Sequence, residues 1–184
     1  PKVEHTPPEI TQQLRADSSM KEVVDIIAAH KNVNSEDIIN KILVPIAYHE
    51  TGGTYDPKQA QYGGGPGRGL MQFEGSYRHP EDRPKDKKGH SLNNPFESAI
   101  QRAKNFYRDK RFKSLKRDVP KWISEIEQGA DAASLSAGQQ MLLTLFDYTM
   151  KGGADISKVL SGDEDLVDFW LESHWAGKEE DKEA

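Results

Sequence analysis

Two carboxylates beside a glycine-rich stretch are the residues of this chain best suited to acid–base chemistry. Glu50 ends an apolar segment, and Glu74 follows a stretch in which seven of the chain's 15 glycines lie between Gly52 and Gly69. Glycines in such density allow backbone conformations with φ > 0 and let another group approach the backbone closely. The pattern therefore predicts a site in which a helix end, a turn and a second carboxylate come together.

The position of Glu50 follows from the spacing of its apolar neighbours. Residues at offsets of 3, 4, 7, 8 and 11 before it share one face of a helix, and they are Ala47, Ile46, Leu43, Ile42 and Ile39. Gly52 and Gly53 should end this helix. Apolar neighbours and the negative end of the helix dipole would both raise the pKa of Glu50, which suits a proton donor. The alternative is a glutamate that reaches solvent at a frayed helix end.

Two short motifs in this region resemble those of a known family. Glu50-Thr51-Gly52-Gly53 is similar to the Glu-Ser-Gly motif of soluble lytic transglycosylases and goose-type lysozymes, and Gly69-Leu70-Met71-Gln72 matches their Gly-Leu-Met-Gln motif. Pro57-Lys58-Gln59-Ala60 lies where the family often has a Pro-x-Ala segment. The flanking residues are most similar to lysozyme-like domains of tailed phages, and the close match covers roughly residues 38 to 75.

The resemblance implies a fold and an activity. The fold is mainly α, an α+β lysozyme-like domain with a small β-hairpin beside the active-site cleft. The activity is cleavage of the β-1,4 bond between N-acetylmuramic acid and N-acetylglucosamine in peptidoglycan, with Glu50 as general acid. The substrate-binding residues that we expect on this basis are Gly69, Leu70, Met71, Gln72, Tyr148, Tyr62 and Asp56. Tyr148 is included because Phe146-Asp147-Tyr148 stands where the family has Ala-Tyr-Asn.

The role of a second carboxylate decides the product. In a strand from Leu70 to Glu74, Gln72 and Glu74 share one face, so Glu74 faces the cleft if Gln72 does. If Glu74 or Asp56 positions a water or stabilises positive charge, the bond is hydrolysed. If neither takes part, Glu50 acts as acid and then as base, and the product is the 1,6-anhydro sugar of a lytic transglycosylase. We favour hydrolysis, and Glu74 as a solvated charge at a strand end is the alternative.

Other kinds of chemistry fit the sequence less well. His49-Glu50 lacks the second histidine of a zinc-protease motif because residue 53 is glycine, and no Lys-Ser/Thr follows the glycines as in a phosphate-binding loop. The absence of cysteine excludes disulfides, thiolate metal sites and a cysteine nucleophile. We therefore expect no metal and no cofactor. A module of this type that binds glycan or a virion protein without cutting is the alternative from another functional class.

Composition and charge limit the partners. The chain has 184 residues, 35% hydrophobic and 30% charged, with a net charge of −5, as expected for one soluble domain without a nucleic-acid-binding surface. No apolar run is long enough for a membrane span or a signal peptide. We expect a monomer whose partner is the peptidoglycan glycan strand, with virion or tail proteins as further partners. Its expected location is the phage virion, or the host cytoplasm before delivery to the periplasm or cell wall.

The expected organisation is a flexible N-terminal arm at 1–17, a single domain at 18–176 and an acidic tail at 177–184. Within the domain, Ser19–Glu22 and Ser136–Gln139 are capping boxes that open helices, the second of them central and buried. Pro45 should kink the Glu50 helix or begin a new turn. Residues 75–93 are interpreted as a mobile loop, and the basic segment 102–117 as a solvated face or as attraction for an anionic polymer. Phe169 and Trp170 are expected to dock a C-terminal helix.

Overall fold

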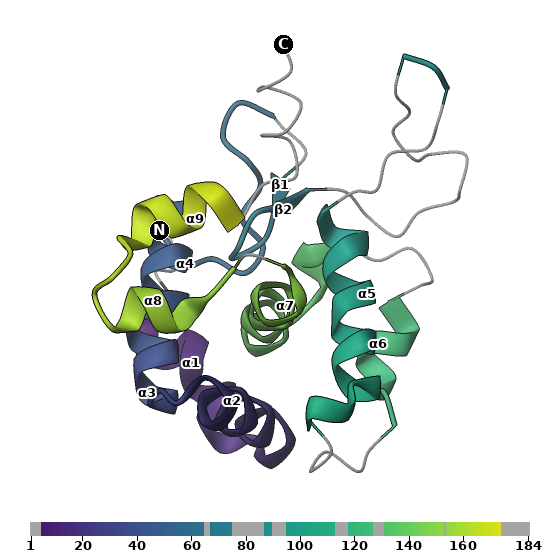
Figure 1. Ribbon diagram of the computed structural model, residues 1–184. Helices are drawn as coiled ribbons and strands as arrows, with labels where there is room; N and C mark the ends of the chain where they lie inside the picture. Colours follow the sequence, from purple (N-terminus) through teal and green to yellow (C-terminus); the bar gives the residue numbers. More distant parts are fainter. Residues whose placement is uncertain are drawn as a thin grey trace.

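Helix α7 (Ala137–Met150) lies at the centre of the molecule, and the other helices surround it (Figure 1). In this computed structural model, residues 5–64, 67–74, 87–89, 95–112, 118–126, 131–152 and 154–173 are described. Ser136 caps α7 and Gln139 completes the capping box, as predicted. Every residue from Gln140 to Tyr148 is buried, which confirms the prediction of a central buried helix.

The N-terminal segment is a helix, so the prediction of a flexible arm at 1–17 is wrong for the described part of it. Helix α1 (Pro7–Ala16) begins with a capping box formed by Thr6 and Glu9, and it packs on α7 and on α2 (Ser18–Lys31). The prolines misled the prediction, because a proline in the first helical turn removes only an N–H that would have no helical partner. Ile10 and Leu14, one turn apart, bury the inner face of the helix.

A run of three helical segments leads to Glu50. These are α3 (Ser35–Asp37), the π-helical segment η1 (Ile38–Leu43) and α4 (Val44–Glu50). Pro45 lies in the first turn of α4, so the expectation of a new turn at this proline is confirmed. The wider π turn ends where the Val44 amide donates to the Ile39 carbonyl.

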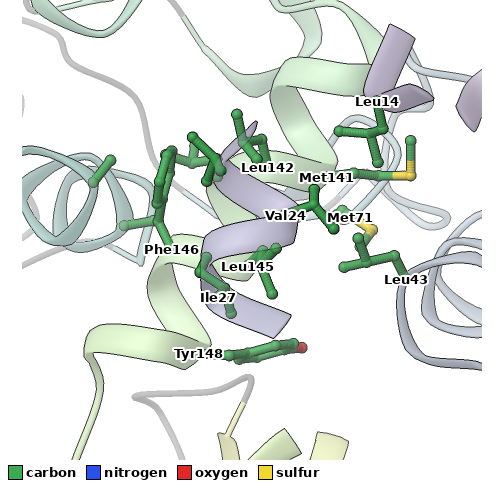
Figure 2. Packing of buried hydrophobic residues seen from close by; sticks show 14 of the residues in the cluster. Leu14, Val24, Ile27, Leu43, Met71, Met141, Leu142, Leu145, Phe146 and Tyr148 are labelled. Atoms are coloured by element: carbon green, nitrogen blue, oxygen red, sulfur yellow. The ribbon is translucent and has the colours of Figure 1, made fainter. Parts of the chain in front are cut away.

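The other elements complete the layers around α7. Helix α5 (Pro95–Arg108) runs beside α7 (Figure 1), and the rings of Phe106 and Phe146 lie 5.0 Å apart between them. Short elements follow: the 3-10 turns η3 (Lys110–Phe112) and η5 (Ala132–Ser134), and the helices α6 (Lys121–Glu125), α8 (Ile156–Leu160) and α9 (Leu166–Ser173). Figure 2 shows the core, where Leu14 of α1, Leu43 of η1 and Met71 meet side chains of α7.

A two-stranded antiparallel sheet lies near the end of α4. Strand β1 (Gly67–Arg68) pairs with β2 (Phe73–Glu74), with Gly67 opposite Glu74 and Arg68 opposite Phe73. The described chain is thus mainly helical with a small sheet, as predicted at this coarse level. Within it, none of the helices combines the length and the apolar character that crossing a membrane requires. The predicted acidic tail and, except for 87–89, the predicted mobile loop lie outside the described residues.

Candidate active site

Glu50 is the last residue of α4, where the apolar face of the helix meets the surface. Its predicted neighbours on that face are all buried: Ile39, Ile42, Leu43, Ile46 and Ala47. Two glycines with positive φ follow, Gly52 at 61° and Gly53 at 85°, and they end the helix as predicted. The pKa of Glu50 is raised to about 7, chiefly by burial and in part by the negative charge of Glu74. The prediction of a carboxyl group with a raised pKa is therefore confirmed.

A hydrogen bond from Trp170 restrains the Glu50 carboxyl group. The indole Nε1–H of Trp170, on α9, donates to Oε1 of Glu50 at 2.7 Å. This bond favours the charged form of Glu50 and so partly opposes the effect of burial on its pKa. The ring of His49 meets the Trp170 ring edge to face, with centroids 4.9 Å apart. The sequence suggested only that Trp170 docks a helix, because nothing in it pairs residues so far apart.

Glu74, on β2, is the second carboxylate of the site. Its charge acts on Glu50, and its own pKa is raised by burial. Two carboxyl groups that interact in this way disfavour ionisation of one another, so the pair holds a proton to higher pH than a free glutamate does. The expectation that Glu74 lies in the same site as Glu50 agrees with this coupling, although the strand argument behind it does not hold.

The segment Gly69–Gln72 is a turn, and its side chains point into the protein. The predicted strand from Leu70 is wrong, because Gln72 has a positive φ of 53° and only Phe73–Glu74 pair as a strand. Leu70 and Met71 are completely buried in the core. The Gln72 side-chain amide donates to the carbonyls of Gln59 and Gly69 at 3.0 and 2.8 Å. The side chains of this motif hold the turn together, which places Leu70 and Met71 away from any substrate.

Gln140, which the sequence did not single out, holds this turn on α7. Its Oε1 accepts from the Leu70 amide at 2.7 Å, and its Nε2 donates to the carbonyls of Pro57 and Leu135, both at 2.9 Å. Gly69 has a φ of 86°, and a Cβ added there would lie 2.1 Å from Oε1 of Gln140. The contact with Gln140 is therefore sufficient to require glycine at position 69, and a contact of Gly69 with substrate stays a prediction.

Tyr148 and Tyr62 both lie near the end of α4, and they differ in exposure. Tyr148, on α7, is buried, and burial together with the charges of Asp147 and Glu50 raises its pKa well above the usual value. Its ring packs edge to face on Phe169 of α9, with centroids 5.1 Å apart. Tyr62 is 65% exposed, and its hydroxyl donates to the carbonyl of Thr51, the residue after Glu50. Tyr62 is thus available to a ligand, whereas Tyr148 supports the site from inside.

Asp56 lies in a different environment. Its Oδ1 accepts from the Lys58 amide at 2.9 Å and lies 3.9 Å from the His5 ring, beside the start of α1. Glu74, not Asp56, is the carboxylate whose charge acts on Glu50. The interpretation of Asp56 as a water-positioning residue receives no support from these contacts.

The described residues and the comparisons with known proteins limit how the site can be explained. Among the described residues, no group of three or more His, Asp or Glu side chains could hold a metal ion. Comparisons of the chain with protein-family models, curated proteins and solved structures give no significant match. A function must therefore be argued from the geometry and chemistry of Glu50 and its neighbours.

Proposed function

We propose that the protein is a lysozyme-like muramidase that hydrolyses the β-1,4 bond between N-acetylmuramic acid and N-acetylglucosamine in peptidoglycan. The observation that carries the proposal is Glu50, a half-buried carboxyl group with a pKa raised to about 7 beside a second carboxylate. Pairs of carboxyl groups with different pKa values are the machinery of glycoside hydrolysis. The motif resemblance around residues 50 and 69 supplies the substrate class, and a helical domain with a small sheet suits a lysozyme-like fold.

In the proposed reaction, protonated Glu50 transfers its proton to the glycosidic oxygen as the bond from that oxygen to the sugar carbon breaks. Positive charge develops on the sugar, and ionised Glu74 stabilises it and accepts a proton from the attacking water. The products are two sugar chains, and the cleavage creates a new reducing end on one of them. Solvent then returns the proton to Glu50 and removes the one on Glu74. A water between the carboxyl groups requires a gap of about 6.5–9.5 Å, and the inverting arrangement stays a prediction.

A lytic transglycosylase is the second candidate, favoured by the same pKa. A carboxyl group with a pKa near 7 can return as a base after it has acted as an acid, so Glu50 alone could form the 1,6-anhydro product. In this case Glu74 would contribute only by raising the pKa of Glu50. Tyr62, exposed beside the Glu50 turn, is the proposed contact for a sugar ring in either reaction.

The test is lysis of purified bacterial cell walls, followed as loss of turbidity, with mass spectrometry of the released fragments. Glu50→Gln keeps the shape of the side chain but has no transferable proton, so lysis should fall at least ~10²–10⁴-fold. Glu74→Gln should lose most activity if hydrolysis is correct, and the wild-type fragments should carry reducing ends. Glu125→Gln, at an exposed glutamate on α6, is the matched control.

Different results would identify the alternatives. Anhydro fragments together with a fully active Glu74→Gln would establish the transglycosylase. Wild-type lysis by Glu50→Gln would reject the proposed role of Glu50. A wild-type protein that sediments with cell walls but releases no fragments would be a glycan-binding module.

A further inference from the structure

Helix α9 reaches the Glu50 carboxyl group although it lies far away in the sequence. Asp165 directly precedes the helix, and its side chain accepts from the amides of Val167 and Asp168 at 2.9 and 3.4 Å. Phe169 is 1% exposed and packs on Tyr148 of α7. Trp170 follows one residue later, about 100° around the helix, and turns its indole toward α4. Two neighbouring aromatic anchors therefore fix both the position and the rotation of α9.

The contact between Trp170 and Glu50 selects one of the two carboxyl oxygens. The indole N–H can only donate, and it donates to Oε1 of Glu50 at 2.7 Å. An oxygen that accepts a hydrogen bond is the poorer place for a proton, so this bond by itself favours the proton on Oε2. His49 packs edge to face on the same indole at 4.9 Å and restrains the plane of the ring.

We propose that Trp170 is a positioning residue for Glu50, whose indole N–H holds Oε1 so that Oε2 presents the transferable proton. The proposal rests on the proposed general-acid role of Glu50 and adds a residue that lies outside both sequence motifs. When the proton leaves Oε2 for the glycosidic oxygen, the charge left on the carboxylate is stabilised by the same N–H. Trp170 thus orients the acid before proton transfer and supports its conjugate base afterwards.

The other groups near Glu50 have different effects. Among the described residues, the charge of Glu74 on β2 raises the pKa of Glu50, and the charge of Glu50 in turn helps to raise the pKa of Tyr148 on α7. Glu74 therefore disfavours the charged form of Glu50, whereas the Trp170 bond favours it. Tyr148 stays neutral where Glu50 titrates, because its own pKa is raised well above the usual value. On α4 itself, His49 contacts the Trp170 ring. Removal of the indole N–H should consequently raise the pKa of Glu50, a change in the opposite direction from removal of the Glu74 charge.

The experiment compares wild type with Trp170→Phe, which keeps an aromatic ring but has no donor. Glutamate side-chain carboxyl carbons are titrated by ¹³C NMR, with the Glu50 signal assigned by its loss in Glu50→Gln. We expect the midpoint of Glu50 to rise by about one pH unit, because a hydrogen bond to the charged form is lost. The alkaline limb of the wall-lysis profile should move by the same amount, with activity at the optimum reduced about 10-fold or more. Trp122→Phe, on α6, is the matched control and should change neither.

A purely structural role of Trp170 predicts a different result. A folded Trp170→Phe protein whose Glu50 midpoint is unchanged would overturn the proposal. If that variant fails to fold, the sulfur isostere of tryptophan at position 170 keeps the shape and removes only the N–H, and the same titration decides. The titration does not depend on activity. A shifted Glu50 midpoint in Trp170→Phe together with no wall lysis by the wild-type protein would reject the muramidase, and lysis by the wild-type protein together with an unshifted midpoint in the variant would reject the positioning role.

Discussion

At the scale of single residues, the acidity of Glu50 is linked to the stability of the fold. Burial raises its pKa from 4.5 to about 7, so between these pH values the folded protein binds a proton that the unfolded chain releases. A carboxyl group whose pKa is raised on folding makes its full contribution to stability at pH values below the pKa that it has in the unfolded chain. That contribution is lost as the pH rises through the pKa that the group has in the folded protein. Because Glu50 is not fully buried, the loss should be about 1–3 kcal/mol, below the full value of the shift.

Glu50→Gln should therefore be more stable than wild type at pH 8 and about equally stable at pH 4. The glutamine is neutral at both values, whereas the wild-type carboxylate is charged and poorly solvated at pH 8. Urea unfolding at the two pH values measures the difference, and Glu125→Gln should show no such pH dependence. Equal stabilities of wild type and Glu50→Gln at pH 8 would mean that the carboxylate is well solvated in the folded protein.

Only part of this site could be predicted from the sequence. Glu50 was found because the spacing of apolar residues in one helix is local information. Glu74 was chosen because Gln72 and Glu74 would share one face of a continuous strand. The positive φ of 53° at Gln72 breaks that strand, so the alternation of side chains between its two faces does not apply. Trp170 donates to Glu50 across 120 positions of sequence. No periodicity in either segment could have indicated that contact, which depends on how α9 packs.

At the scale of elements, the turn at Gly69 depends on its fit to α7. Gly69→Ala should lower the free energy of unfolding by about 2–4 kcal/mol, since a side chain with positive φ is strained and its Cβ would displace the buried Gln140 amide. Gly64→Ala is the matched control. Gly64 has a similar φ of 80° but nothing within 4 Å of an added Cβ, so its cost should be about 1 kcal/mol.

Chemical denaturation of the two variants measures the difference, which isolates the Gln140 contact from the backbone strain. Equal costs at the two positions would mean that Gln140 moves aside easily. A loss of wall lysis without a loss of stability in Gly69→Ala would support the prediction that Gly69 lies against the substrate.

The helices were easier to predict than the turn because their signals are repeated along the sequence. The Ser136 capping box and the apolar run after it correctly indicated α7. The strand prediction at Leu70 used a few alternating residues, and these instead fold into a turn whose polar groups bond to Gln59 and Gln140. Such partners come from other elements, so a short segment does not contain the information that determines its conformation.

At the scale of the whole molecule, α7 connects the candidate site to the N-terminal helix. Near its start, Gln140 holds the turn at Leu70, and Tyr148 near its end contacts the anchor of α9. Helix α1 packs on the beginning of α7, where Gly138 leaves room for Gln13, and the Ser136 hydroxyl donates to the Gln13 side chain at 2.7 Å. Helix α1 thus stabilises the end of α7 that holds the turn.

A chain that begins at residue 18 should consequently be far less stable than the full chain. Burial of Ile10 and Leu14 is worth about 1.5–3 kcal/mol each, a large part of the 5–15 kcal/mol that holds a typical domain together. Thermal unfolding followed by circular dichroism should show a much lower melting temperature. In the full chain, Leu14→Ala should cost about 2–5 kcal/mol, while Gln12→Ala, exposed on the same helix, should change stability by about 0.5 kcal/mol or less. If the shortened chain and the full chain had the same melting temperature, α1 would contribute little to stability, as expected of a flexible arm.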